Sequence, residues 1–131
     1  MTVQALMALM NIAPTASGRP FAEEIFPDGI RTMSQGMLAV DPTVLDLVLS
    51  GSFSPIYDPH RRLEMPVTVV AADPAFPDAV TRPDDLAQIA ASTPHARTHT
   101  MEGSGHLIHD TKSARESYQH LVIEFLDSLP R

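Results

Sequence analysis

A histidine behind a glycine-rich turn and an aspartate behind an apolar run have the residue types and setting that suit catalysis. His106 follows Gly103-Ser104-Gly105. Glycines let the backbone turn sharply and leave an imidazole accessible, as a general base requires. Asp73 directly follows the apolar run 67–72, and a carboxylate there can bind the Nδ1–H of an imidazole and fix its tautomer. The pair predicts general-base chemistry assisted by a carboxylate.

Each of these two residues also has a plainer interpretation. His106 can be a loop histidine without a role, and the Asp73-Pro74 pair is typical of a turn. Asp78 lies in the same segment and is the alternative acid. Ser104 is two residues from His106 in a tight turn, a spacing that seldom gives a serine the geometry to attack a substrate, so we interpret it as a small residue that fits the turn.

The remaining histidines do not predict a metal site. His95 and His99 would face the same side of a strand but lie too far apart to share one ion without further ligands. His106 and His109 form the other close pair, and we expect His109 and Asp110 to cap the last helix instead. With no cysteine in the chain, thiolate ligands and disulfides are excluded. We therefore expect no metal ion and no cofactor.

The second half of the chain must position these residues. Residues 67–72 are continuously apolar, which is typical of a strand buried on both faces of a parallel sheet. Pro83 begins a helix, residues 96–101 form a second strand, and a final helix carries one apolar stripe. The order strand–helix–strand–helix predicts a β-α-β unit of the α/β class. Two strands are a small sheet, so we expect a missing N-terminal segment or a second chain to complete it.

The first half reads as a series of short helices. Residues 3–12 have apolar residues at helical spacing, residues 21–26 form a short segment stopped by Pro27-Asp28-Gly29, and residues 30–40 resume the helix. Asp41-Pro42 begins the next helix, and residues 52–62 read as a linker. We therefore divide the chain into a helical region, 1–62, and a β-α-β-α segment, 63–131.

Bulk composition narrows the classes of partner. The 131 residues carry a formal net charge of −7 and no basic stripe, which disfavours nucleic acid and anionic membrane surfaces. The apolar N-terminal run is about half the length that spans a bilayer. Absence of cysteine is compatible with a reducing cytoplasm, where we expect the protein to work.

The order of these pieces resembles the C-terminal part of an α/β-hydrolase. Residues 66–73 look like the strand that precedes the family's catalytic acid, and Glu102 to His106 look like the turn that ends in its catalytic histidine. The helical first half looks like the family's cap. The resemblance implies an α/β-hydrolase fold, a triad containing Asp73 and His106, and a small apolar ester or related acyl substrate.

One essential part of that family is missing from the sequence. A serine hydrolase of this kind carries a Gly-x-Ser-x-Gly nucleophile elbow before the cap, and no such pentapeptide occurs here. Two hypotheses follow. The chain supplies the acid and histidine to a triad whose serine lies in another segment or chain; alternatively, it is a truncated, inactive remnant that self-associates as a homodimer.

Overall fold

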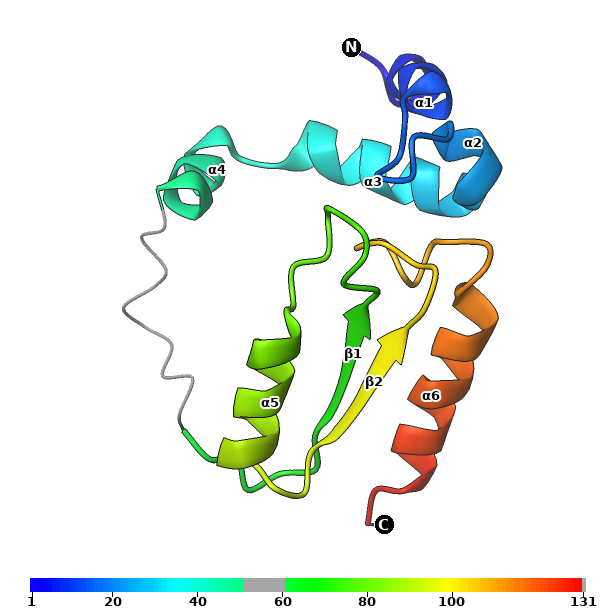
Figure 1. Ribbon diagram of the computed structural model, residues 1–131. Coiled ribbons are helices and arrows are strands. Elements are labelled where there is room, and N and C mark those ends of the chain that lie inside the picture. The colour runs from blue at the N-terminus through cyan, green and yellow to red at the C-terminus, as the bar shows by residue number, and fades with distance from the viewer. Residues whose placement is uncertain (51–60, 131) are drawn as a thin grey trace.

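Four helices precede a β-α-β-α unit in the structure, a computed structural model that describes residues 1–50 and 61–130. The predicted helical first half and strand-containing second half are both present (Figure 1). The bounds of the elements are α1 (Val3–Ile12), α2 (Phe21–Glu24), α3 (Pro27–Ala39), α4 (Pro42–Leu49), β1 (Thr68–Ala72), α5 (Pro83–Ser92), β2 (Arg97–Met101) and α6 (Arg115–Asp127). The proposed linker, 52–62, falls mostly outside the described residues.

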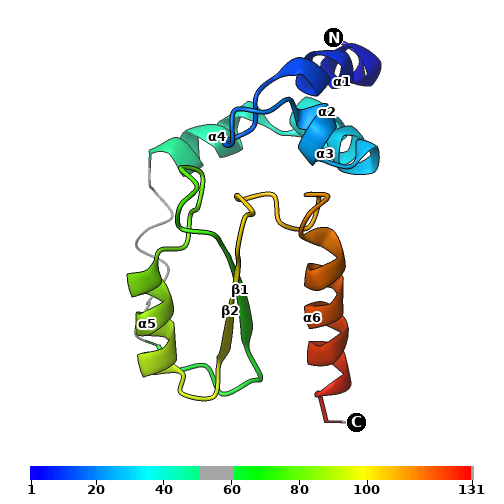
Figure 2. The ribbon, with the colours of Figure 1, turned by 45° about the vertical axis from the view of Figure 1, so that its right-hand side comes forward.

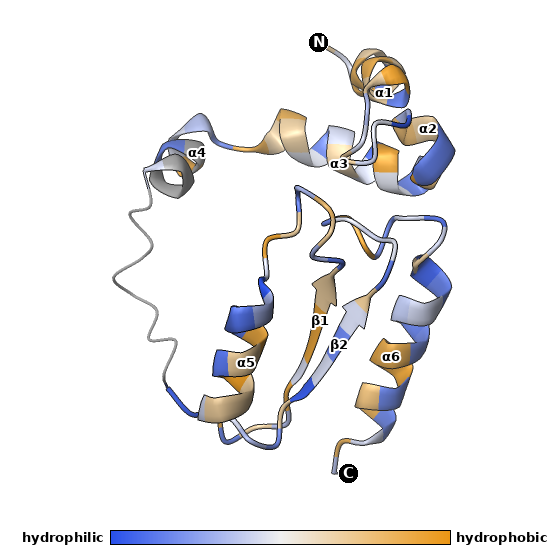
Figure 3. Ribbon diagram, viewed as in Figure 1, coloured by the Kyte–Doolittle hydropathy of each residue, from blue (hydrophilic) through white to orange (hydrophobic). Residues whose placement is uncertain are grey.

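A parallel pair of strands forms the sheet of the described residues. β1 pairs with β2 in a register that runs from Thr68 opposite Arg97 to Ala72 opposite Met101. Helix α5 connects them and lies on one face, while α6 lies on the other (Figure 2). This confirms the α/β class and the β-α-β order. The two strands differ in character, since β1 is apolar and β2 is largely polar (Figure 3).

The helical first half lies across the carboxyl ends of the strands. In Figure 1 both strand arrows point toward α2 and α3. Helix α1 packs on α3 and α2. Ile25, which pairs with Thr111 of the loop before α6, and Ile30 of α3 are both buried. The arrangement places the ends of β1 and β2 beneath the helices.

Pro27 begins α3, so the predicted stop at Pro27-Asp28-Gly29 was wrong. The break consists of Ile25 and Phe26, which are both extended; for Phe26 (φ −67°, ψ 146°) this is the conformation that a following proline favours. Proline is well suited to the first turn of a helix, where its missing N–H has no partner to lose. The prolyl residue therefore starts the helix that the sequence pattern seemed to interrupt.

Backbone hydrogen bonds tie the helical layer to the loop before α6. Ile25 and Thr111 form an antiparallel bridge. On either side of it, the Lys112 N–H donates to the Glu24 carbonyl at 2.7 Å, and the Phe26 N–H donates to the Asp110 carbonyl at 3.0 Å. Three consecutive residues of each segment thus pair like a very short sheet.

Arg115, the first residue of α6, reinforces this junction. Its guanidinium pairs with Asp28 of α3 at 3.0 Å and with the buried Asp110 carboxylate at 3.1 Å, and it lies 4.0 Å above the Phe26 ring. Hydrogen bonds from Arg115 hold the pKa of Asp28 below its ordinary value. The expectation that His109 and Asp110 cap α6 was wrong, because Ala114 is the N-cap and, among the described residues, no side chain caps the helix. The Asp110 carboxylate binds the Arg115 and His109 side chains instead.

The core of the sheet unit is small. Its buried cluster consists of Ala72, Ala79, Ile108 and Ala114, with Val70, Met101 and Tyr118 packed against it. Outside it, α6 exposes Ile123 and Leu126 by more than half, and α1 exposes Leu9 and Ile12 to a similar or larger extent. Much of the apolar surface in the described residues is therefore open to a further partner.

We expect two glycines of α3 to respond oppositely to alanine. A Cβ on Gly29 would lie 2.5 Å from Cγ of the buried Asp110, whereas a Cβ on Gly36 would have nothing within 4 Å. Gly36→Ala should raise the free energy of unfolding by about 0.5–1 kcal/mol through helix propensity. Gly29→Ala should lower it by about 1–3 kcal/mol through overpacking at the junction. Urea unfolding followed by circular dichroism measures both, and equal stabilisation by the two variants would contradict this account of the junction.

Candidate functional site

Two loops that follow the strands meet at the carboxyl edge of the sheet. The loop after β1 contains Asp73, and the loop after β2 contains Gly103 to His106. Parallel strands end at the same edge, so residues far apart in sequence become neighbours there. The Asp73 N–H donates to the Ser104 carbonyl at 2.9 Å, and the Gly103 N–H donates to Asp73 Oδ2 at 2.8 Å. The structure thus joins the segments that carry the two predicted site residues.

The Asp73 carboxylate accepts a hydrogen bond on each oxygen. Besides Gly103 N–H on Oδ2, Ala75 N–H donates to Oδ1 at 2.9 Å. These bonds, that from Gly103 foremost, hold the pKa of Asp73 below its ordinary value, so the group is an anion at neutral pH. The Ala75 bond is the local turn expected of Asp-Pro, while the Gly103 bond is a long-range contact with the histidine loop.

His106 is exposed, and its backbone binds the alternative acid. The His106 N–H donates to Asp78 Oδ2 at 3.1 Å. Gly105 packs closely against the Asp78 carboxylate: a Cβ at position 105 would lie 2.6 Å from Asp78 Oδ1. Within residues 1–50 and 61–130, the His106 imidazole makes no hydrogen bond or ion pair. The structure therefore brings Asp73 and Asp78 to the loop of His106 without joining either carboxylate to its ring.

The turn between β2 and His106 depends on one glycine. Gly103 has φ +71°, a left-handed conformation that side chains with a Cβ seldom adopt. Ser104 is buried to 1% exposure, and its hydroxyl lies 3.4 Å from the Gly105 carbonyl. This contact directs the Ser104 hydroxyl into the turn, in agreement with its interpretation as a small residue that fits there.

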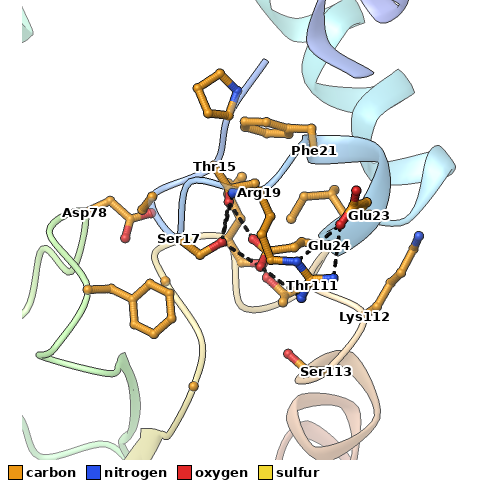
Figure 4. A pocket seen from close by; sticks show the side chains of 17 residues that line it. Thr15, Ser17, Arg19, Phe21, Glu23, Glu24, Asp78, Thr111, Lys112 and Ser113 are labelled. Atoms are coloured by element: carbon orange, nitrogen blue, oxygen red, sulfur yellow. Dashed lines mark hydrogen bonds and ion pairs between the residues drawn. The ribbon is translucent and has the colours of Figure 1, made fainter. Parts of the chain in front are cut away.

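A cleft of about 490 Å³ lies between the helical layer and these loops (Figure 4). Asp78, Gly103 and Gly105 line it, whereas Asp73 and His106 are not among its lining residues. Phe76 of the loop after β1 also lines it. The helical layer and the segment before α6 supply the rest of its wall, namely Pro14, Thr15, Ala16, Ser17, Arg19, Phe21, Glu23, Glu24, Ile25, Leu107, Thr111, Lys112 and Ser113. The cleft opens beside the predicted site.

One wall of the cleft is a polar cluster that the sequence did not indicate. The Glu24 carboxylate accepts hydrogen bonds from Thr15 Oγ1 at 2.5 Å and Ser17 Oγ at 2.7 Å, and Arg19 lies 3.7 Å away. Burial raises the pKa of Glu24. The hydrogen bonds from the Thr15 and Ser17 hydroxyls and the charge of Arg19 lower it by a larger amount, so the pKa lies below its ordinary value. In sequence, residues 14–20 read only as a break between helices, and no motif marked them.

The other histidines lie in separate places. His95 Nε2 contacts the Met65 carbonyl at 2.8 Å, His109 Nε2 lies 3.1 Å from Asp110, and His120 Nε2 lies 3.5 Å from Glu124 on the same helix. Across the described residues, no three His, Asp or Glu side chains gather in a group suited to a metal ion.

No family model matches this chain, and no curated protein or solved structure matches it either. In the part of the chain that the structure describes, no helix combines the length and apolar character needed to cross a bilayer. The likeness to α/β-hydrolases therefore stays a prediction from the sequence.

We expect the acid stability of the protein to depend on Asp73. Because its pKa is lower in the folded state than its ordinary value of 3.8, its contribution to stability is complete above that pH and is lost as the pH falls through the lower folded-state value. Asp73→Asn should reduce the urea midpoint at pH 6, and the difference from the wild type should shrink between pH 4 and pH 2. Asp127→Asn, which removes an equal charge at the end of α6, serves as the control. A difference for Asp73→Asn that stays constant with pH would contradict this assignment.

Proposed function

We propose that this chain supplies the acid and the base of a serine-type α/β-hydrolase whose nucleophile lies in another segment or chain. The proposal is supported by the parallel β-α-β unit, by two loops that meet at its carboxyl edge, and by a cleft beneath a helical layer. Ligands of open α/β sheets bind outside the carboxyl ends of the strands. The candidate residues are Asp73, Asp78 and His106.

The hydrogen bond from Gly103 N–H to Asp73 Oδ2 carries the proposal. A catalytic acid works by fixing the orientation and tautomer of the histidine, so it must be held in a constant position relative to the histidine loop. This bond joins residues 30 positions apart in sequence, and the reciprocal bond from Asp73 N–H to the Ser104 carbonyl closes a ring. A turn aspartate without such a role needs only its local Ala75 contact.

The proposed chemistry is acyl transfer to water. A serine from another segment or chain would attack the ester carbonyl while His106 accepts its proton, and His106 would then give that proton to the leaving alkoxide, which departs as the alcohol. Water would next attack the acyl-serine while His106 accepts a proton from it, and His106 would return this proton to the serine oxygen as the carboxylic acid is released. A neighbouring carboxylate would stabilise the imidazolium. Asp73 is our first choice of acid, because two backbone amides fix its carboxylate against the histidine loop. Asp78 is the alternative, since it already contacts the backbone of His106.

The rest of the enzyme would cover surfaces that this chain leaves open. The apolar strand β1 has a neighbour on one side only among the described residues, and Ile123 and Leu126 of α6 are exposed. A further segment or second chain carrying a Gly-x-Ser-x-Gly elbow would extend the sheet. We place the assembly in the cytoplasm, with a small apolar ester as substrate and with neither nucleic acid nor membrane as a partner.

Self-association is the second candidate, and the exposed apolar side chains of α1 and α6 favour it. In that case a homodimer would bury these faces, and Asp73 and His106 would have no catalytic role. This alternative predicts that the native species contains two copies of this chain and no other protein. The mass of the native species therefore helps to distinguish the two candidate functions.

The decisive test is the native mass of the species that contains this chain, purified from its own host at natural abundance through a terminal tag. The sample is then treated with a fluorophosphonate probe, which labels an activated serine covalently. A larger polypeptide or hetero-complex labelled on a Gly-x-Ser-x-Gly serine supports the hydrolase. An unlabelled monomer or homodimer overturns it, and the homodimer supports the self-associating remnant.

Variants of that native species should separate the roles of the site residues. We expect His106→Ala to lower kcat for p-nitrophenyl butyrate by about 10²–10⁴-fold, the usual contribution of a general base. His120→Ala is the matched control, because His120 is exposed on α6 and, among the described residues, its ring pairs with Glu124 alone. Asp73→Asn should lower kcat with little change in KM. A larger loss of kcat for Asp78→Asn would assign the acid role to Asp78, and full activity of His106→Ala would refute the triad.

A further inference from the structure

The cleft has the size and lining of a site for a small organic molecule. Its volume of about 490 Å³ falls within the range of about 300–1,000 Å³ usual for ligand pockets. Apolar side chains contribute much of the wall, namely Pro14, Phe21, Ile25, Phe76 and Leu107. Such a surface favours a ligand with an apolar body. The charged groups that line the cleft then determine which charge the polar end of that ligand must carry.

Three of the charged groups that line the cleft, Arg19, Glu23 and Glu24, contact one another and together carry one net negative charge. Arg19 pairs with Glu23 at 3.2 Å and lies 3.7 Å from Glu24. The Glu24 carboxylate is further occupied by the hydroxyls of Thr15 and Ser17. Each charged group of this cluster therefore has a partner within it. The other charged groups that line the cleft are the Asp78 carboxylate and the Lys112 ammonium.

Asp78 and Lys112 lie on opposite sides of the Thr15–Glu24 cluster (Figure 4). The Lys112 ammonium donates to the Ala22 carbonyl in α2 at 2.8 Å, and the Lys112 backbone N–H donates to the Glu24 backbone carbonyl. These two bonds hold Lys112 at the junction. Asp78 accepts one hydrogen bond, from His106 N–H. In the part of the chain that the structure describes, no cation lies within ion-pair distance of Asp78. Its negative charge is left for a ligand.

We propose that this cleft binds a small organic cation with an apolar body, such as an arylalkylammonium, and that Asp78 receives its charged end. Phe76 stands two residues before Asp78 and lines the same cleft. Aromatic rings attract cations through the negative potential of their faces, and a carboxylate beside them adds a charge-assisted hydrogen bond. The apolar body fits against Phe21, Ile25 and Leu107. This inference does not require a serine nucleophile, so it stands or falls separately from the proposed hydrolase.

The test is a titration of the full chain, labelled with ¹⁵N, with three probes of similar shape and different charge. The probes are 2-phenylethylammonium, 2-phenylethanol and phenylacetate, used at pH 7 and low salt. For ligands of this size we expect a Kd of about 1 mM for the ammonium, about 10-fold weaker binding of the alcohol, and still weaker binding of the carboxylate. Amide shifts of Phe76, Asp78 and residues 103–107 should report the ammonium, and its affinity should fall as salt is raised.

Asp78→Asn should remove the preference for the ammonium over the alcohol, while its amide oxygen can still accept from His106 N–H. Asp84→Asn, an equal change in charge on α5 away from the cleft, should leave the preference intact. Phe76→Leu should weaken the ammonium more than the alcohol. Tighter binding of phenylacetate would assign recognition to Lys112 and overturn the proposal. An unchanged preference in Asp78→Asn, or no binding of any probe, would overturn it as well.

Discussion

The contact between Arg115 and two aspartates joins the two parts of this chain, and the arrangement of the site depends on it. Asp28 belongs to the helical layer, Asp110 precedes α6, and Arg115 binds both while covering the Phe26 ring. Asp110 is 8% exposed, so its charge needs a partner within the protein. Gly29 allows this close approach because it has no Cβ where the Asp110 side chain lies. One guanidinium thereby fixes α3 against the start of α6.

The cleft follows from this junction, because its walls come from both parts of the chain. The Thr15, Ser17 and Glu24 cluster belongs to the helical layer, whereas Asp78 and Gly105 belong to the loops that follow the strands. The bridge between Ile25 and Thr111 sets the distance between them. A shift of the helical layer would change the cleft without altering either wall. Packing at the junction and ligand binding are therefore coupled physically.

The carboxylates near His106 divide two tasks between them. Asp73 binds backbone amides of both loops and so helps to hold the carboxyl edge of the sheet together. Asp78 contacts the same histidine loop but also faces the cleft. In the proposed hydrolase the first would orient the base, and in the proposed cation site the second would bind the charged end of the ligand. A non-catalytic protein would still retain the second property, since recognition of a cation needs only the cleft.

The sequence by itself determined the local elements of this protein. Residues 3–12 form the predicted helix, and the apolar run before Asp73 and the segment before Glu102 form the predicted parallel strands. Such patterns are read correctly because helix periodicity and uninterrupted apolar runs depend on near neighbours in the chain. They also placed Asp73 and the turn of His106 at one edge of the sheet, as the topology of parallel strands requires.

Only the tertiary structure decided which side chains meet. The pairing of Arg115 with Asp28 spans 87 positions, and that of His106 N–H with Asp78 spans 28. Pro27 begins a helix instead of ending a segment, since the extended Phe26 and the contacts of its neighbours with residues 110–112 set the break earlier. The Glu24 cluster carries no motif at all. Long-range ion pairs leave no periodic trace in a sequence, because their geometry arises only when the elements pack.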